Sequence, residues 1–492
     1  MGDELAGAGY SRADHTRYRR AVQRCLDALE EMLDAGSFEE DEWRTGLEIE
    51  LNLVDSSFQP TMKNDEVLER IDDWRYQTEL GRFNIELNVE PRRIDGQSLL
   101  NLESGMRKNL NRARDRAGDV GAGLVMVGVL PTLRPPEPGR SWFSPSERYR
   151  LLDEAILTAR KEDVEIDIRG YERLRMTADT IAVEAACTST QFHLQVRPNR
   201  FARYWNAAQA LAGSQLALGA NSPYVFGHRL LAESRTELFL QSTDTRPPEL
   251  RNQGVRPQVP FGERWISSIF DLFEENVRYY PALLPEVSDE DPFETLAAGG
   301  TPELAELRLH NGTIYRWNRP VYDVSDGRPH LRVENRVLPS GPTVIDVLAN
   351  AAFFYGVSVA MVLDEQRPIW SRMSFDAARE NFRSAARDGN YARLYWPGLG
   401  HVEWDELVLR TLLPMAQRGL ERLGVAQDVL DRYLPVIEGR ARRRVNGASW
   451  QIAATEAFER RGMDRWQALT HMLEEYVHLM HANEPVHAWP LP

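Results

Sequence analysis

Acidic and amide side chains occupy every second position in two short segments of the sequence. GLEIEL, residues 46–51, alternates Glu48 and Glu50 with apolar residues, and FNIELNVEP, residues 83–91, does the same with Asn84, Glu86, Asn88 and Glu90. Successive side chains of a β-strand point to opposite faces of its sheet. Each segment therefore predicts a strand with one apolar face and one face of oxygen ligands.

Two later segments repeat this alternation with different polar groups. TQFHLQVRP, residues 190–198, carries Gln191, His193 and Gln195 on one face, and HLRVENRVLP, residues 330–339, carries Arg332, Glu334 and Arg336. If the four strands are neighbours, one face of the sheet gathers carboxylates, one imidazole and two guanidinium groups.

Carboxylates that are crowded together repel one another, and a divalent cation is the usual remedy. Hard oxygen ligands with few histidines favour Mg²⁺ or Mn²⁺ over Zn²⁺, and Mg²⁺ keeps coordination positions for water and substrate phosphates. Guanidinium forks bind phosphate or carboxylate. The pattern predicts a site for a Mg²⁺-bound nucleotide triphosphate, with Glu86 and its neighbours as ligands.

A simpler interpretation exists for each strand taken alone, because an alternating glutamate is usually a solvated residue on an exposed face. The combination of four such strands, with Glu-x-Glu and Arg-x-Glu-x-Arg among them, favours the shared site.

Other motifs favour structural roles. The glycines of DVGAGLVMVG precede a strand instead of following it, so they do not form a dinucleotide fingerprint. Cys187 is expected to be a core cysteine and not a nucleophile. The arginine run at 439–447 is more typical of a solvated helix face than of a phosphate contact, and His478 and His481 are expected on a surface helix instead of at a metal site.

The surrounding elements must position these residues. Periodicity predicts helices at 14–34, 64–74, 98–118, 204–221 and 343–363, and a further buried strand at 123–131. Two long stretches, 244–265 and 285–304, are predicted to be functional loops or lids.

Strands with one polar face that are separated by helices favour an α+β fold, an antiparallel sheet with helices packed behind it. We expect residues 1–372 to form the catalytic sheet core with an N-terminal helix and inserted loops. Residues 373–492 are expected to form a helical C-terminal region packed on that core.

Composition limits the partners and the location. The 59 basic and 74 acidic residues give a net charge of -15, which disfavours nucleic acid or an anionic membrane as partner. Two cysteines and the absence of a secretory signal in the first twenty residues predict a cytoplasmic protein. The uncharged segment 348–363 is too short for a membrane span and is expected to be a buried helix.

The sequence resembles the glutamate-cysteine ligase family, in particular its bacterial carboxylate-amine ligase branch, which has a glutamine synthetase-like fold. The matching segments occur in the family's order between about residues 44 and 451: GLEIEL, FNIELNVEP, QFHLQV, RVENR and NGASWQ. Members of this branch often have His-x-His where this chain has Gln191 and His193.

The resemblance implies a curved antiparallel sheet around a funnel-shaped active site with ATP and two or three Mg²⁺ ions, Mn²⁺ being an alternative. The implied metal ligands are Glu48, Glu50, Glu86, His193 and Glu334, with Glu90 an alternative to Glu86. The implied catalytic residues, with the two arginines facing phosphate and the substrate carboxylate, are Arg332, Glu334 and Arg336. The implied ATP-binding residues are Gln191, His193, Gln195 and Arg336.

The activity implied is ATP-dependent ligation of a carboxylate to an amine through an acyl phosphate, which forms a γ-glutamyl amide. Glutamate and cysteine are the default substrates, as in glutathione biosynthesis, and the partners are small amino acids. A homo-oligomer is possible in such a family. Two alternatives stay open: a Mg²⁺-dependent phosphotransferase or ATP hydrolase on the same fold, and a non-catalytic relative that acts as a binding partner.

Overall fold

The computed structural model describes residues 10–136, 142–363 and 366–492. The expectation about the first twenty residues falls in part on residues 1–9, which lie outside the described residues. The chain begins with α1 (Arg12–Ala35), which carries the predicted apolar stripe and ends at Gly36 in the left-handed conformation. A capping box formed by Ser11 and Asp14 fixes its start.

The centre of the protein is a seven-stranded sheet in which all pairings are antiparallel. Its order is β10 (Asn318–Ser325), β11 (Arg328–Pro339), β7 (Ser189–Gln195), β1 (Arg44–Val54), β3 (Asn84–Arg93) and β2 (Tyr76–Thr78), with β4 (Gly123–Val125) also pairing with β1. The α+β class and the antiparallel sheet that the sequence predicts are confirmed.

The register places the four predicted strands side by side in the order β11, β7, β1 and β3. Glu50 lies opposite Glu86, and Glu48 lies opposite Gln191 on its other side. His193 lies opposite Glu334. Residues that share a pair share a face, so the polar side chains of all four strands gather on one face.

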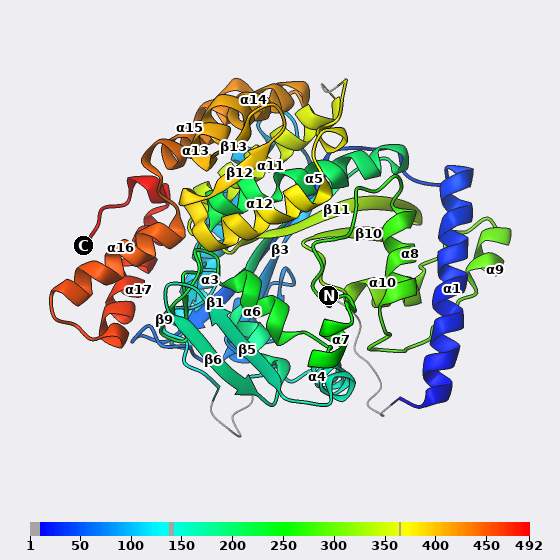
Figure 1. Cartoon of the computed structure of the whole chain (residues 1–492), viewed down its shortest axis with the longest axis horizontal. Helices are drawn as coiled ribbons and strands as arrows, with labels where there is room; N and C mark the ends of the chain where they lie inside the picture. The colour runs from blue at the N-terminus through cyan, green and yellow to red at the C-terminus, as the bar shows by residue number, and fades with distance from the viewer. Residues whose placement is uncertain (1–9, 137–141, 364–365) are drawn as a thin grey trace.

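Two long helices, α5 (Pro198–Gly219) and α11 (Val344–Leu363), cover the apolar face (Figure 1). Phe192 on β7 packs against Phe354 and Tyr355 of α11, with ring centroids 6.1 and 5.9 Å apart. By length and composition α11 could cross a membrane, but its most apolar window is entirely buried inside the protein. It is the buried helix that the sequence predicts.

A second layer of helices lies over the first: α12 (Phe375–Asp388), α14 (Leu413–Arg422) and α15 (Gln427–Arg443). The backbones of α11 and α14 approach closely because two glycines meet. A Cβ atom at Gly419 would overlap the carbonyl oxygen of Gly356. One hydrophobic core extends across residues before and after 372, and the division at residue 372 stays a prediction.

The remaining elements surround this framework (Figure 1). Helices α1, α8 and α10 pack together beside the β10 edge of the sheet, and α16 and α17 pack on each other near the C-terminus. The bounds are α2 (Asn64–Ile71), α3 (Ser98–Gly118), α4 (Glu147–Arg160), β5 (Val164–Arg169), β6 (Arg173–Ala178), the 3₁₀ helix η1 (Ile181–Ala186), β8 (Tyr224–Val225), β9 (His228–Arg229), α6 (Arg235–Ser242), α7 (Pro248–Asn252), α8 (Phe270–Tyr279), α9 (Pro292–Ala297), α10 (Ala305–Gly312), η2 (Ile369–Ser371), η3 (Gly389–Tyr391), β12 (Arg393–Trp396), β13 (Gly400–Glu403), α13 (Trp404–Leu407), the π-helix η4 (Val408–Leu412), α16 (Gly447–Arg460), α17 (Arg465–Ala482) and η5 (Val486–Ala488).

Three predictions about elements are corrected. The strand predicted at 123–131 pairs only over Gly123–Val125, because the carbonyl of Val127 accepts hydrogen bonds from the side chains of Asn52 and Thr188 instead of a strand neighbour. The predicted loops at 244–265 and 285–304 contain the short helices α7 and α9. The C-terminal region is not purely helical, since β12 and β13 form a hairpin within it.

Candidate active site

A cavity of about 830 Å³ lies over the polar face of the sheet. Its walls come from the central strands, from α4, η1 and α10, and from residues 286–288 of the second predicted loop. The elements below the sheet in Figure 1, including α4 and α6, lie on the side opposite to α5 and α11. The sheet therefore separates a packed apolar side from a hollow polar side.

Three carboxylates converge at one end of this cavity. Glu50 and Glu86 face each other across β1 and β3, and Glu79 follows β2; each offers one oxygen, and the three oxygens lie within 4.8 Å of one another. Glu50 is oriented by the backbone N–H of Ser189 at 2.6 Å, by the Ser189 hydroxyl at 2.9 Å and by the Gln191 amide at 3.0 Å. Asn88 donates to Glu86 at 2.8 Å.

This carboxylate triad of Glu50, Glu79 and Glu86 fits a divalent cation. Burial raises the pKa of all three groups, and the charges of neighbouring glutamates raise the pKa of Glu79 and Glu86 further. A cation held among the three oxygens would remove that repulsion, and an all-oxygen donor set suits Mg²⁺ or Mn²⁺. The triad includes two of the predicted metal ligands, and Glu79 is an addition to them.

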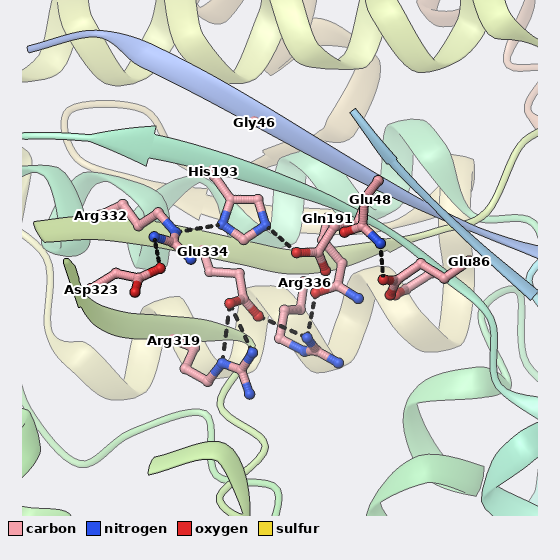
Figure 2. A network of polar contacts seen from close by, with 12 residues as sticks. Gly46, Glu48, Glu86, Gln191, His193, Arg319, Asp323, Arg332, Glu334 and Arg336 are labelled. Carbon is pink, nitrogen blue, oxygen red and sulfur yellow. Dashed lines mark hydrogen bonds and ion pairs between the residues drawn. The ribbon is translucent and has the colours of Figure 1, made fainter. Parts of the chain in front are cut away.

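A second group runs from Arg332 through His193 to Glu48 (Figure 2). Arg332 Nε donates to His193 Nδ1 at 3.2 Å, and His193 Nε2 lies 2.9 Å from Glu48 Oε1. Because an arginine nitrogen can only donate, Nδ1 accepts, and the hydrogen of the neutral imidazole is then on Nε2, the ring nitrogen beside Glu48. Burial opposes ionisation of Glu48, but the neighbouring His193 outweighs it and lowers the pKa of Glu48.

Glu334 is held between two arginines (Figure 2). Arg319 donates to its Oε2 atom at 2.9 and 3.2 Å, and Arg336 donates to its Oε1 atom at 2.7 Å and also to the Gln191 side chain. Burial alone would raise the pKa of Glu334, but the two guanidinium groups lower it well below its usual value. Glu334 is therefore a buried carboxylate that stays ionised.

The structure brings most of the predicted site residues to one cavity. Its lining includes Glu48, Glu50, Glu86, Gln191, Arg332, Glu334 and Arg336. His193 lies directly between two of these lining residues. Their roles as metal ligands, ATP-binding groups or catalytic groups stay predictions.

Two of the residues that the sequence predicts as ligands, Gln195 and Glu90, lie elsewhere. The amide of Gln195 donates to Glu39 at 3.3 Å and to the carbonyl of Asp41 at 3.2 Å, and Gln195 does not line the cavity. Glu90 is exposed, whereas Glu86 belongs to the carboxylate triad. The geometry thus favours Glu86 over Glu90 as the candidate metal ligand.

The other motifs have structural surroundings. Cys187 lines the cavity, but its thiol donates to the Arg235 carbonyl and burial raises its pKa well above the ordinary value, which keeps it protonated. In the arginine run, Arg442 and Arg443 are exposed, as expected for a solvated helix face, whereas Arg440 is buried and pairs with Asp346. The run does not line the cavity. His478 and His481 lie on α17, as predicted, outside the cavity.

The NGASWQ segment joins α16 to the end of α5. Asn446 caps α16 and donates to the Ala217 carbonyl, and Gln451 donates to Asn221. It is not part of the cavity lining.

Sequence patterns did not reveal Glu79 or Arg319. Glu79 follows a strand of three residues, which is too short to show alternation. For Arg319 a signal existed: the Asp326-Gly327 turn, with both residues at positive φ, joins β10 to β11 as a tight hairpin. Counting back from that turn places Arg319 opposite Glu334.

The fold and the polar face define a class of protein, the carboxylate-amine ligases with a glutamine synthetase-like fold. A model of Glutamate-cysteine ligase family 2 (GCS2) matches residues 44–465, and the chain therefore belongs to this family of ATP-dependent ligases. The family that the sequence motifs indicate is thus confirmed. None of the curated proteins matches the chain significantly.

Solved structures show the same fold at low sequence identity. Glutamate–cysteine ligase from Francisella tularensis, in complex with AMP, has a TM-score of 0.54 and 11% identity, covering 92% of this chain and 91% of that one. A bifunctional glutathione synthetase from Pasteurella multocida has a TM-score of 0.51 and 13% identity, covering 93% of this chain and 53% of that one. At such identities the likeness concerns the fold alone.

Proposed function

We propose that this protein is an ATP-dependent carboxylate-amine ligase that forms an amide through an acyl phosphate, with glutamate as the default acid and cysteine as the default amine. One observation carries the proposal. A carboxylate triad suited to Mg²⁺ and three arginines, Arg319, Arg332 and Arg336, surround one cavity on a sheet of the ligase fold.

The cavity has the size and charges that this reaction needs. Its volume of about 830 Å³ lies in the range of pockets that enclose small-molecule ligands. Carboxylates at one end would hold Mg²⁺ on the oxygens of Glu50, Glu79 and Glu86, and Mg²⁺ supplies charge neutralisation for nucleotide phosphates when bound.

The chain's own residues stabilise the transferring phosphoryl group. In the proposed reaction an oxygen of the substrate carboxylate attacks the γ-phosphorus of ATP, and ADP leaves. Arg336 and Arg332 line the cavity as fixed cations, and preorganised cations favour the negative charge that spreads over the phosphoryl oxygens. Glu334 holds the Arg336 guanidinium in place and so acts on its orientation.

The second step needs little covalent chemistry from the protein. The amine attacks the acyl carbon, and phosphate leaves with the oxygen that belonged to the carboxylate. The amine must lose a proton, and the carboxylates of the cavity are acceptors within its walls. Positioning and charge stabilisation are therefore the main tasks of the site. This reaction requires no serine or cysteine nucleophile, and none was assigned above.

The test measures phosphate release with ATP, Mg²⁺ and L-glutamate across a panel of amines that includes cysteine. Release that depends on an amine, with a γ-glutamyl amide identified by mass spectrometry, supports the proposal. An ¹⁸O label in the substrate carboxylate should appear in the released phosphate if an acyl phosphate forms. Phosphate release that no acid or amine stimulates would instead indicate an ATP hydrolase.

A further inference from the structure

Two charged side chains in the cavity have no protein partner among the described residues. Arg148, on the first turn of α4, lines the cavity, and its buried Nη1 atom makes no hydrogen bond. Glu184, on η1, also lines the cavity, and no hydrogen bond or ion pair involves its carboxylate. Unsatisfied buried polar groups are costly in a folded protein and mark places where a ligand completes the structure.

The other charged groups of the lining either have a hydrogen-bond or ion-pair partner or belong to the carboxylate triad. Arg308 pairs with Asp323 at 2.9 Å, and Arg319, Arg332 and Arg336 are bound as described above. Glu286 accepts a hydrogen bond from Tyr10 at 2.8 Å and does not pair with Arg148. Within the described chain, Arg148 and Glu184 are thus the charged residues of this lining that have no partner and do not belong to the carboxylate triad. Burial and the charge of Glu50 raise the pKa of Glu184 to about 8, and a cationic group beside it would lower that pKa.

The two elements that carry this pair are fixed to each other. Asp153 of α4 accepts hydrogen bonds from the backbone N–H of Ile181 at 2.8 Å and from the Thr180 hydroxyl at 3.2 Å, at the start of η1. Leu152 and Ile156 of α4 pack with Ile181 in a separate hydrophobic cluster. Arg148 and Glu184 are therefore held on one rigid unit, which lowers the cost of ordering them around a ligand.

Two tyrosines, Tyr149 and Tyr315, line the same cavity as Arg148 and Glu184. Burial raises the pKa of both Tyr149 and Tyr315, and the charge of Glu184 raises both further while that of Arg148 lowers both. Both hydroxyl groups thus lie in the field of the two charges. Arg148 and Glu184 nevertheless do not pair with each other, so the space between them suits a molecule that carries both signs of charge.

We propose that Arg148 and Glu184 bind the zwitterionic head group of an α-amino acid, with Arg148 receiving the α-carboxylate and Glu184 the α-ammonium group. The inference rests on the proposed function, which requires an acid and an amine in this cavity. Either substrate could supply such a head group: the acid that is phosphorylated on its side chain, or the amino acid whose amine attacks.

The test compares each amino acid with analogues that lack one of the two groups, by calorimetric binding to the full chain with Mg²⁺ and a non-hydrolysable ATP analogue. For the acid these are L-glutamate, glutarate without the amine, and 4-aminobutyrate without the α-carboxylate. For the amine they are L-cysteine, 3-mercaptopropionate and cysteamine. The twenty protein amino acids are screened first, and the one that binds is tested if neither default does.

The expected results are group-specific. Arg148→Gln should weaken binding of the amino acid by about tenfold or more, which is the value of a charge-assisted hydrogen bond, and leave the analogue without the α-carboxylate unchanged. Glu184→Gln should weaken the amino acid similarly and leave the analogue without the amine unchanged. Loss confined to the glutamate series assigns the head group to the acid, and loss confined to the cysteine series assigns it to the attacking amine.

The control is Arg150→Gln, also on α4, whose exposed side chain pairs with Glu147 and Glu154 outside the cavity; it should bind as the unmodified chain does. Equal weakening of complete and truncated ligands, no weakening at all, or no binding of any amino acid by the unmodified chain would overturn the inference. Group-specific binding without any ligation would overturn the proposed function alone, and ligation without the group-specific pattern would overturn this inference alone.

Discussion

Arg319 and Glu334 face each other across the β10–β11 hairpin, and the guanidinium group donates to a single carboxylate oxygen through two nitrogens, at 2.9 and 3.2 Å. Arg336 occupies the other oxygen. The carboxylate of Glu334 is therefore fixed by two cations, Arg319 on the neighbouring strand β10 and Arg336 two residues further along β11.

Removing one of these cations should impair the site. Arg319→Gln leaves Glu334 with Arg336 alone, and we expect ATP turnover to fall about tenfold to hundredfold because the fixed charges of the cavity are rearranged. The measurement is kcat and KM for ATP, together with the thermal unfolding midpoint. Arg328→Gln, at the exposed start of β11, is the control. Undiminished turnover in Arg319→Gln would contradict the importance of this pair.

The carboxylate triad predicts a stability that depends on Mg²⁺. At a Mg²⁺ concentration of a hundred times its Kd, binding should raise the free energy of unfolding by about 2.7 kcal/mol. Glu79→Gln should lose most of this increase, yet without Mg²⁺ it should be at least as stable as the unmodified chain, since one repelling carboxylate is gone. Chemical denaturation with Mg²⁺ and with a chelator measures both effects.

Glu90→Gln is the matched control for the triad, because Glu90 lies on the same strand as Glu86 but is exposed. It should keep the full response to Mg²⁺. A response in Glu79→Gln equal to that of Glu90→Gln would show that the triad does not bind the cation.

Two glycine-to-alanine substitutions should have opposite effects on the free energy of unfolding, because only one of the two glycines lies in the close contact of α11 and α14. Gly419→Ala places a methyl group on the Gly356 carbonyl and should destabilise the protein by about 3 kcal/mol. Gly105→Ala, in the middle of α3 with no atom of another element within 4 Å of the new methyl group, should stabilise it by about 0.5–1 kcal/mol. Equal effects in denaturant unfolding would contradict the packing described here.

Stability should also fall in acid because of Glu103. Burial raises the pKa of this carboxyl group, but hydrogen bonds from Arg432, Tyr433 and Asn483 outweigh it and lower the pKa below its ordinary value. The stabilisation is therefore complete above the unfolded-state pKa and is lost as pH falls through the lower folded-state pKa.

The variant Glu103→Gln isolates this effect. At pH 7 it should be less stable than the unmodified chain by about 1–3 kcal/mol, and the difference should shrink as the pH falls through the lowered folded-state pKa of Glu103, where the native carboxyl group is protonated as well. Urea unfolding at several pH values measures it. A difference that is independent of pH would contradict the role of the charge.

Strands with regular alternation were the part of the fold that the sequence could predict. The strands that carry Glu48, Glu50, His193 and Glu334 have at least seven residues, so the alternation of polar and apolar residues is visible in the sequence. The chemistry of the polar residues then predicts that these strands share one face, even without the strand order. Gln195 shows the limit of that reasoning. By its place in the alternation Gln195 belongs to the polar face. It is the last residue of its strand, however, and its side-chain amide donates to Glu39 and to the carbonyl of Asp41.

Residues brought in by packing could not be predicted in this way. Arg148 and Glu184 lie on a helix and a 3₁₀ helix, and nothing in their local sequence distinguishes them from other charged surface residues. Their position depends on how α4 and η1 pack over the sheet, which is a long-range property of the fold.

The strand order has a consequence for the synthesis of the chain. The last strands of the central sheet to be made, β10 and β11, supply Arg319, Arg332, Glu334 and Arg336, and β11 must insert between β10 and β7. A nascent chain that has left the ribosome only as far as β7 already holds the three glutamates of the carboxylate triad, but none of these four residues. The carboxylate triad is therefore made early in translation and the arginines late, so that a truncated product is unable to assemble the complete polar face.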